Sequence, residues 1–131
     1  MAFKCVVVTP EQQMFDDSIT QAIVPAHDGQ VGILTGRAPI LVKLGAGELK
    51  LDLQGAQSRS FFIDGGIAQL KDNVLTILPQ EARLPGELSV ETARAEEAEA
   101  TAMRITDEKS FNERQHRLQR ARAIKELAGK R

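Results

Sequence analysis

The 131-residue sequence has no tryptophan or tyrosine, a single cysteine and a formal net charge of −1. Cys5 alone cannot form an internal disulfide, and no pair of Cys or His residues has the spacing of a zinc site. The nearly balanced charge gives no general attraction to nucleic acid, whose phosphates require a basic surface. These absences exclude a disulfide scaffold and a zinc module, and they favour a reducing compartment.

Long apolar runs are also absent. No stretch approaches the roughly 20 apolar residues that span a bilayer, and the run from Cys5 to Val8 is too short for a signal-peptide core. We therefore expect no exported precursor and no transmembrane helix, so that a membrane would be reached through another protein. The composition, 42% hydrophobic and 27% charged, is typical of a folded globular chain.

The first part of the chain, to about Pro79, is predicted to be all β because short apolar segments alternate with Gly, Pro and Asp. Residues 46–53 alternate polar and apolar side chains, which places Leu49, Leu51 and Leu53 on one buried face. Further strands are expected at 61–63, 67–70 and 74–78, with tight turns at 64–66 and 71–73.

The pattern changes after Arg83, and from Ser89 neither Gly nor Pro occurs until Gly129. Ser89 is expected to cap a first helix that runs to about Arg104. We accordingly divide the chain into a β-sandwich domain, residues 1–85, and a helical domain, residues 86–131.

A second helix is predicted from near Phe111, because Ser110 to Glu113 matches the S-x-x-E capping box. Gly129 is expected just past its end. Two helices joined by a loop of about five residues should lie antiparallel as a hairpin. The expected fold is therefore mainly β, a sandwich followed by a C-terminal antiparallel two-helix hairpin.

The hairpin has a thin apolar seam and segregated charge. Residues 104–131 carry nine basic and four acidic side chains, whereas the first helix is acidic. The helices can therefore attract each other, and the second can meet an acidic partner. Because a buried methylene contributes about 0.8 kcal/mol, a seam rich in alanine should release the hairpin at modest cost. The seam is expected to contain Ala93, Ala95, Ala98, Ala100, Ala102, Met103, Phe111, Leu118, Ala121 and Ile124.

Three segments in the same order resemble the epsilon subunit of the bacterial F-type (rotary) ATP synthase. They are residues 11–15 (EQQMF), 24–39 (VPAHDGQVGILTGRAP) and 62–66 (FIDGG). With the helical tail, the resemblance covers essentially the whole chain. It implies a sandwich of about ten short strands and a non-catalytic rotor subunit of the central stalk, peripheral on the cytoplasmic face of the bacterial inner membrane. The resemblance leaves protons and sodium open as the coupling ion.

In that family the sandwich binds the γ subunit and the polar loops of the c-ring. The resemblance implies a docking loop made of Gly29, Gln30, Gly32, Thr35, Gly36, Arg37, Ala38 and Pro39. Some relatives have Glu in place of Gln30 and His in place of Arg37, so here Gln30 can offer a hydrogen bond but no ion pair. From the residues alone, an ordinary glycine-rich hairpin is the alternative.

The family's hairpin is a brake on ATP hydrolysis, folded beside the sandwich in one state and inserted along γ into the catalytic head in another. Basic residues of the second helix then approach acidic segments of the catalytic α and β subunits. The candidates here are Arg114, Arg117, Arg120 and Arg122, because arginine can bind carboxylates with two parallel hydrogen bonds. The alternative is a solvated helix face.

Some bacterial relatives bind ATP on the folded hairpin through a motif of Ile or Leu, Asp, two variable residues, Arg and Ala. Residues 90–95 correspond to this motif, with Glu91 in place of Asp and with Arg94 retained. Arg120 matches one basic residue of the second helix, and Ile124 lies where another would fall. ATP is thus a candidate weak regulatory ligand, and no cofactor or metal is required. The alternative is that Arg94 pairs with Glu91 and Glu97.

Other residues suggest two alternative functions. An enzyme could use His27, Asp28 and His116, but no Ser or Cys nucleophile motif is present and residues 32–37 lack the spacing and the Lys of a phosphate-binding loop. A stand-alone module could bind nucleic acid or a partner helix through its basic helix. Because Phe61 and Phe62 are consecutive, at most one is expected to be exposed for base stacking.

Overall fold

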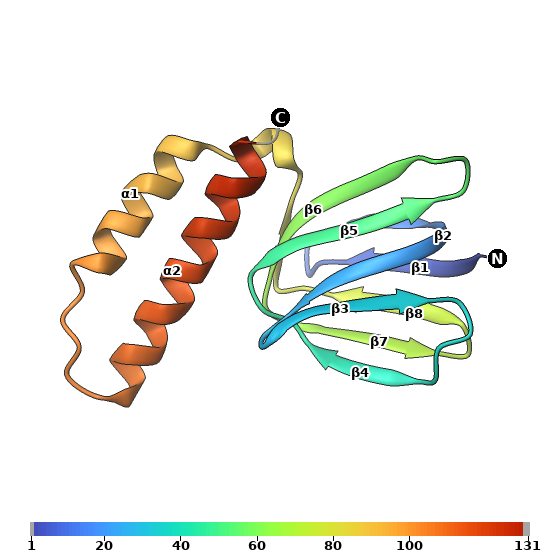
Figure 1. Ribbon diagram of the computed structural model, residues 1–131, viewed down its shortest axis with the longest axis horizontal. Helices are drawn as coiled ribbons and strands as arrows, with labels where there is room; N and C mark the ends of the chain where they lie inside the picture. Colours follow the sequence, from blue (N-terminus) through green and yellow to red (C-terminus); the bar gives the residue numbers. More distant parts are fainter. Residues whose placement is uncertain (1, 130–131) are drawn as a thin grey trace.

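The computed structural model describes residues 2–129, with strands at one end of the molecule and two helices at the other (Figure 1). Within these residues nine strands form where the resemblance implied about ten. The fold class predicted from the sequence is confirmed. The strands are β1 (Phe3–Val8), β2 (Gln13–Ala26), β3 (Gly29–Leu34), β4 (Ile40–Lys43), β5 (Gly47–Leu53), β6 (Ser58–Asp64), β7 (Ile67–Lys71), β8 (Val74–Leu78) and β9 (Glu81–Arg83).

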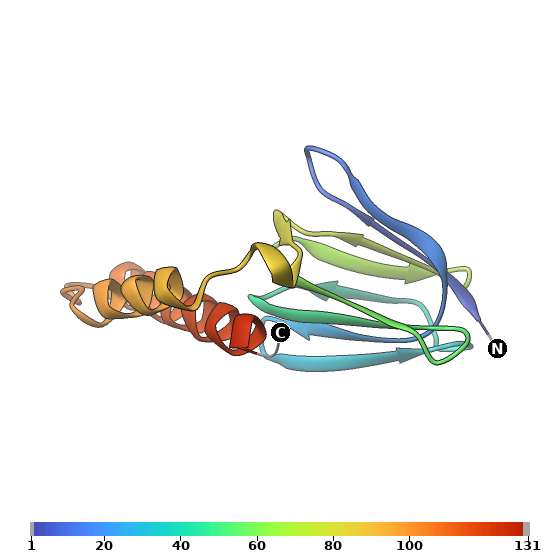
Figure 2. The same ribbon diagram turned by 90° about the horizontal axis from the view of Figure 1, so that it is seen from above.

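The strands form two layers that share the long strand β2 (Figure 2). The first half of β2 pairs with β1, whereas its second half lies between β3 and β5. One layer has the order β3-β2-β5-β6-β9 and the other β4-β7-β8-β1-β2, and β1 runs parallel to β8. Strands β3 and β4, consecutive in sequence, are therefore both edge strands.

The sandwich core is made by the inward-facing side chains of both layers. Leu49 and Leu51 are fully buried, and Leu53 is partly buried against them, as the alternating pattern predicted. Cys5 is also fully buried, and burial raises its pKa to about 12. The thiol therefore packs as a small apolar group.

Both predicted tight turns are present. Gly65 and Gly66 have positive φ between β6 and β7, and Asp72 and Asn73 have positive φ between β7 and β8. These are the residue types that tolerate this conformation.

A short 3₁₀ turn, η1 (Pro85–Glu87), leads from the sandwich to helix α1 (Val90–Thr101). The Ser89 hydroxyl accepts a hydrogen bond from the Thr92 amide at 3.3 Å, which confirms the predicted cap. The helix ends at Thr101, so the predicted end at Arg104 is wrong by three residues.

Helix α2 (Glu108–Gly129) begins earlier than predicted, and the capping box at Ser110 is wrong. The Ser110 amide donates to Asp107 Oδ1 at 2.8 Å, and the Ser110 hydroxyl accepts from the amides of Thr106 and Asp107. The hydrogen bond from the Ser110 amide is the main cause of a lowered pKa of the Asp107 carboxyl. Asp107 thus caps α2, and Gly129 belongs to the helix instead of following it.

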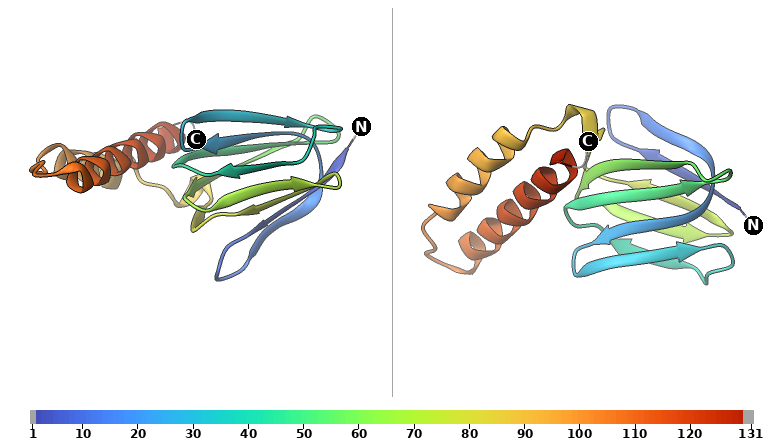
Figure 3. Two further views of the ribbon diagram at one scale, coloured as in Figure 1. Left: turned by 90° about the horizontal axis from the view of Figure 1, so that it is seen from below. Right: turned by 45° about the horizontal axis from the view of Figure 1, so that its top comes forward.

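The two helices are antiparallel, as predicted, and α2 lies between α1 and the sandwich (Figures 1 and 3). Neither helix of the described chain has the length and apolar character needed to cross a membrane. The alanine seam is narrower than expected: Ala93, Ala100, Leu118, Ala121 and Ile124 are buried. Other residues predicted in the seam are exposed, namely Ala95, Ala98, Ala102 and Phe111.

Candidate functional site

The hairpin meets the sandwich over a small apolar cluster that is separate from the sandwich core. Phe61 points into the core, but the next residue of β6, Phe62, points outward and is fully buried beneath the hairpin. Leu88, Ile124 and Leu127 pack around the Phe62 ring. This alternation explains why neither phenylalanine is exposed for base stacking.

An ionic contact centred on Arg120 of α2 adjoins this cluster. Its guanidinium donates to Asp64 Oδ2 at 2.9 Å and to the two Glu81 oxygens at 2.7 and 3.1 Å. Its central carbon also lies 5.3 Å from the centroid of the Phe62 ring. Asp64 and Glu81 are directly opposite on β6 and β9, so one arginine spans both strands.

Three further side chains surround this contact. His116, four residues before Arg120, places Nε2 2.8 Å from Asp64 Oδ1. Arg83 Nε lies 2.7 Å from Glu81 Oε2. Glu96 of α1 lies 4.0 Å from Arg120 Nε. Opposite charges from the sandwich and from both helices therefore converge on one place.

This network is largely shielded from solvent, because the side chains of Asp64 and Arg120 are only 12% and 20% exposed. The hydrogen bond from Arg120 lowers the pKa of Glu81 in spite of its partial burial. Burial alone would lower the pKa of Arg120, but the hydrogen bonds to Glu81 and Asp64 outweigh it and raise that pKa. Both shifts favour the charged forms of the pair.

Further ion pairs connect the helices to each other. Glu97 of α1 contacts Lys125 at 3.0 Å and Arg122 at 3.3 Å. Arg117 lies 3.8 Å from Glu99. The acidic first helix and the basic second helix are thus drawn together, in agreement with the charge pattern of the sequence.

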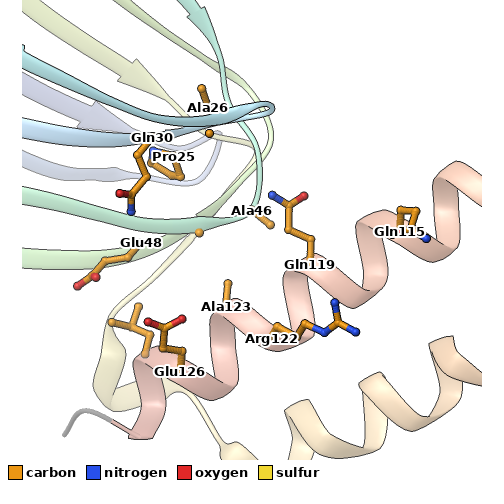
Figure 4. Close-up of a pocket in the computed structure, with 13 residues that line it drawn as sticks. Pro25, Ala26, Gln30, Ala46, Glu48, Gln115, Gln119, Arg122, Ala123 and Glu126 are labelled. Carbon is orange, nitrogen blue, oxygen red and sulfur yellow. The ribbon is translucent and has the colours of Figure 1, made fainter.

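A groove lies on the other side of α2, between this helix and the start of β5 and the β2–β3 turn (Figure 4). It has a volume of about 450 Å³. Gln119 extends from α2 toward the sandwich, and Gln30 lies on the sandwich side. The lining is mixed, with polar side chains such as Glu48, Gln115 and Arg122 beside apolar ones such as Pro25 and Leu127.

The comparisons with known proteins agree with this architecture. The family model described as ATP synthase, Delta/Epsilon chain, beta-sandwich domain matches residues 2–85. The ATP synthase epsilon chain of Granulibacter bethesdensis is 30% identical over 126 residues, which cover 93% of each chain. The chain belongs to the ATP synthase epsilon chain family. The epsilon chain of Rhodopirellula baltica is 40% identical over 82 residues, so the match spans 63% of that relative.

Solved structures have the same fold over nearly the whole epsilon-family chain. A chain in the Euglena gracilis mitochondrial ATP synthase, OSCP/F1/c-ring in rotational state 1, gives a TM-score of 0.83 at 20% identity, covering 95% of this chain and 80% of that one. A chain in the Tetrahymena thermophila mitochondrial ATP synthase central stalk/c-ring gives 0.72 at 16% identity, with 95% of each chain covered. An epsilon chain is a non-catalytic ATP synthase subunit.

The predicted docking loop of this epsilon-family chain is not one loop. Gly29, Gln30 and Gly32 belong to β3, where Gln30 pairs with Pro25 beside the groove. The remaining predicted residues, Thr35, Gly36, Arg37, Ala38 and Pro39, form the turn at the opposite end of β3. Because the intervening segment is an extended strand, residues that are neighbours in the motif lie at the two ends of the sandwich (Figure 1).

The turn after β3 has contacts of its own. Arg37 Nη1 donates to the carbonyl of Gly32 at 3.1 Å, and the Thr35 hydroxyl lies 3.5 Å from Asn73 Oδ1 of the β7–β8 turn. Arg37 thus stabilises the end of β3 in this structure. Its role in docking stays a prediction.

The four arginines predicted to inhibit hydrolysis do not form one exposed patch. Arg120 faces the sandwich, Arg122 and Arg117 contact acidic residues of α1, and Arg114 Nε donates to the Ala100 carbonyl at 3.2 Å. All four are therefore engaged within the chain when the hairpin is folded.

The three candidate ATP-binding residues are not assembled into a phosphate site. Among residues 2–129, the exposed side chains of Glu91 and Arg94 form no ion pair with each other or with Glu97. Arg120 already has two carboxylate partners, and the cavity beside it is lined by four acidic and three basic side chains but by neither Glu91 nor Arg94. The acidic side chains outnumber the basic ones, which disfavours phosphate. ATP binding stays a prediction.

The sequence analysis did not identify Asp64 and Glu81 as partners of Arg120. The local sequence predicts only a turn at Asp64 and offers His116 only as an acid–base candidate. A signal was present, because His116 and Arg120 are four residues apart and must lie on one face of α2. Nothing in the local sequence, however, indicates which strands that face meets.

Proposed function

We propose that this chain is a non-catalytic central-stalk subunit that couples γ to the c-ring through its sandwich and restrains ATP hydrolysis through its hairpin. The observation that carries the proposal is the division of its packing. The sandwich has a core of its own, whereas the hairpin is attached to it through the Phe62 cluster and the Arg120 contact, and the two helices meet along a narrow alanine seam. A rotor subunit of this kind needs a rigid domain that docks on its partners and a second domain that can detach from it.

An apolar surface supports docking on γ. The outer face of β4, β7 and β8 exposes Leu41, Ile67 and Leu78, and Ile67 and Leu78 are directly opposite each other. Leu41, on the edge strand β4, is 67% exposed. Exposed apolar side chains gathered on one face are typical of a protein interface. We assign this face to γ.

The contact with the c-ring is assigned to the β2–β3 end, where Gln30 and Gly29 adjoin the groove. Gln30 offers hydrogen bonds to polar loops without adding charge. The c-ring is named in the Euglena and Tetrahymena assemblies that contain chains of this fold. With γ and the c-ring as partners, the chain would be peripheral at the cytoplasmic face of the bacterial inner membrane, with either protons or sodium as the coupling ion.

The inhibitory state requires the hairpin to leave the sandwich. Arg120 would then lose its contacts with the sandwich. Separation of α2 from α1 would also free Arg114, Arg117 and Arg122, so that all four arginines could engage acidic segments of the catalytic α and β subunits.

Co-purification with γ tests the docking proposal. We expect a stoichiometric complex with the full-length chain, and we expect Leu41→Glu combined with Ile67→Glu to abolish it. Lys50→Glu, at an exposed position of β5 in the other layer, changes the charge by the same amount and is the matched control. Failure of the wild-type chain to bind γ, or its retention on nucleic acid instead, would overturn the proposal in favour of a stand-alone interaction module.

A further inference from the structure

We propose that Asp64 and Glu81 form a guanidinium-binding site on the sandwich that holds Arg120 in the folded state and competes with acidic partner surfaces for the same side chain. The inference deepens the proposed function, because it assumes that the released hairpin acts on other subunits. It names the side chain that holds the hairpin in the folded state, Arg120, and the two carboxylates whose loss would release it, Asp64 and Glu81.

The geometry of the site fits arginine better than lysine. The guanidinium makes three N–H···O contacts of 2.7 to 3.1 Å to two carboxylates on different strands. Its planar group also lies near the Phe62 ring, at 5.3 Å from the centroid. A lysine ammonium is a compact charge that cannot bind both Glu81 oxygens in this planar, two-pronged way. Arg120→Lys should therefore retain the charge but lose much of the attachment.

The two carboxylates need a cation between them. Asp64 and Glu81 are cross-strand partners in the β6–β9 register, and like charges at directly opposite positions destabilise a sheet. Arg83 contacts Glu81, and His116 contacts Asp64 from the hairpin. When the hairpin leaves, Arg120 and His116 leave with it, whereas Arg83 remains in contact with Glu81. The vacated site thus favours return of the hairpin.

The same arginine cannot serve both states. Arg120 is bound by the sandwich in this structure, and the proposed function requires it to meet acidic segments of the catalytic subunits. The acidic pair therefore acts as an intramolecular substitute for those segments. Weakening the pair while keeping Arg120 should increase the population of the released, inhibitory hairpin.

This competition predicts opposite effects of two kinds of variant. Asp64→Asn and Glu81→Gln weaken the site but leave Arg120 free to engage a partner. Arg120→Gln also weakens the site, but it removes the side chain that both states share. All three variants should release the hairpin, yet only the carboxylate variants should inhibit hydrolysis more strongly than the wild type.

Hydrogen exchange of the isolated full-length chain measures release directly. We expect Asp64→Asn, Glu81→Gln and Arg120→Gln each to accelerate exchange of α2 amides about tenfold, with little change in β1 and β8. Combining Glu81→Gln with Arg120→Gln should add little, because both remove one interaction. Lys109→Gln in α2 and Glu11→Gln in the sandwich are charge-matched controls on exposed residues. If Arg120→Gln exchanges no faster than Lys109→Gln, the site is not what holds the hairpin.

ATP hydrolysis by the assembled enzyme tests the competition. Glu81→Gln should lower hydrolysis relative to the wild type, whereas Arg120→Gln should not. Equal shifts in the same direction, or no change with Glu81→Gln, would overturn the shared use of Arg120. A chain truncated after residue 85 separates this inference from the proposed function, since unchanged hydrolysis there refutes inhibition by the hairpin while leaving the exchange result intact.

Discussion

Gly66 lies in the turn between β6 and β7, where the backbone conformation requires glycine. Its φ is +92°, and a Cβ there would collide with the Leu78 carbonyl and the Pro79 backbone. We predict that Gly66→Ala lowers the free energy of unfolding by about 3 kcal/mol, through backbone strain and the collision together. Gly86 has an ordinary φ and open surroundings, so Gly86→Ala is the control. Thermal unfolding followed by circular dichroism would contradict this account if both variants melted together.

Glu81 should make hairpin attachment depend on pH. Its pKa in the folded state is below the ordinary value of 4.5 because Arg120 donates a hydrogen bond to it. The attachment that Glu81 contributes is therefore fully present above about pH 4.5 and is lost as the pH falls through the lowered pKa. Amide chemical shifts around Ile124 should report detachment in this acid range. Glu81→Gln should flatten the dependence, and an unchanged profile in that variant would assign it to other groups.

Strand β6 contributes two adjacent residues to two separate apolar clusters. Phe61 belongs to the sandwich core, where it meets Phe15 edge-on at 6.3 Å between centroids, and Phe62 belongs to the hairpin cluster. Phe61→Ala should destabilise the sandwich by about 3–5 kcal/mol. Phe62→Ala should detach the hairpin and leave the sandwich folded.

Hydrogen exchange resolved by strand and helix distinguishes these two outcomes. Faster exchange confined to α2 and α1 is expected for Phe62→Ala, and faster exchange throughout the strands is expected for Phe61→Ala. Equal loss of protection in the strands of both variants would show that the two clusters fold as one unit.

The elements that local chemistry determines could be predicted from the sequence. The alternation around Leu49, the positive-φ turns and the Ser89 cap all depend on neighbouring residues. The start of α2 could not be predicted, because Asp107 and Ser110 are both cap formers and the S-x-x-E match favoured the wrong one. The Asp107 carboxylate caps the helix because it accepts a hydrogen bond from the Ser110 amide. The Ser110 hydroxyl instead accepts hydrogen bonds from two amides that precede the helix.

At the scale of the whole molecule, the candidate site depends on contacts that no sequence spacing encodes. Arg120 meets Glu81 and Asp64 across separations of 39 and 56 residues. The motif at 24–39 indicated the family, but its linear order did not show that Gln30 lies at the start of β3 and Arg37 in the turn beyond its other end. Family resemblance thus supplied the fold and the subunit, whereas the attachment of the hairpin became visible only when the sandwich and helices were placed together.

In the proposed function, the hairpin restrains ATP hydrolysis. The direct measurement is the hydrolysis rate of the assembled enzyme carrying either the full-length chain or a chain that lacks residues 86–131. The sandwich has its own core and docking face, so the shortened chain should still be incorporated, and its stoichiometry in the purified enzyme provides the control. We predict faster hydrolysis with the shortened chain, and an unchanged rate at equal incorporation would contradict the claim.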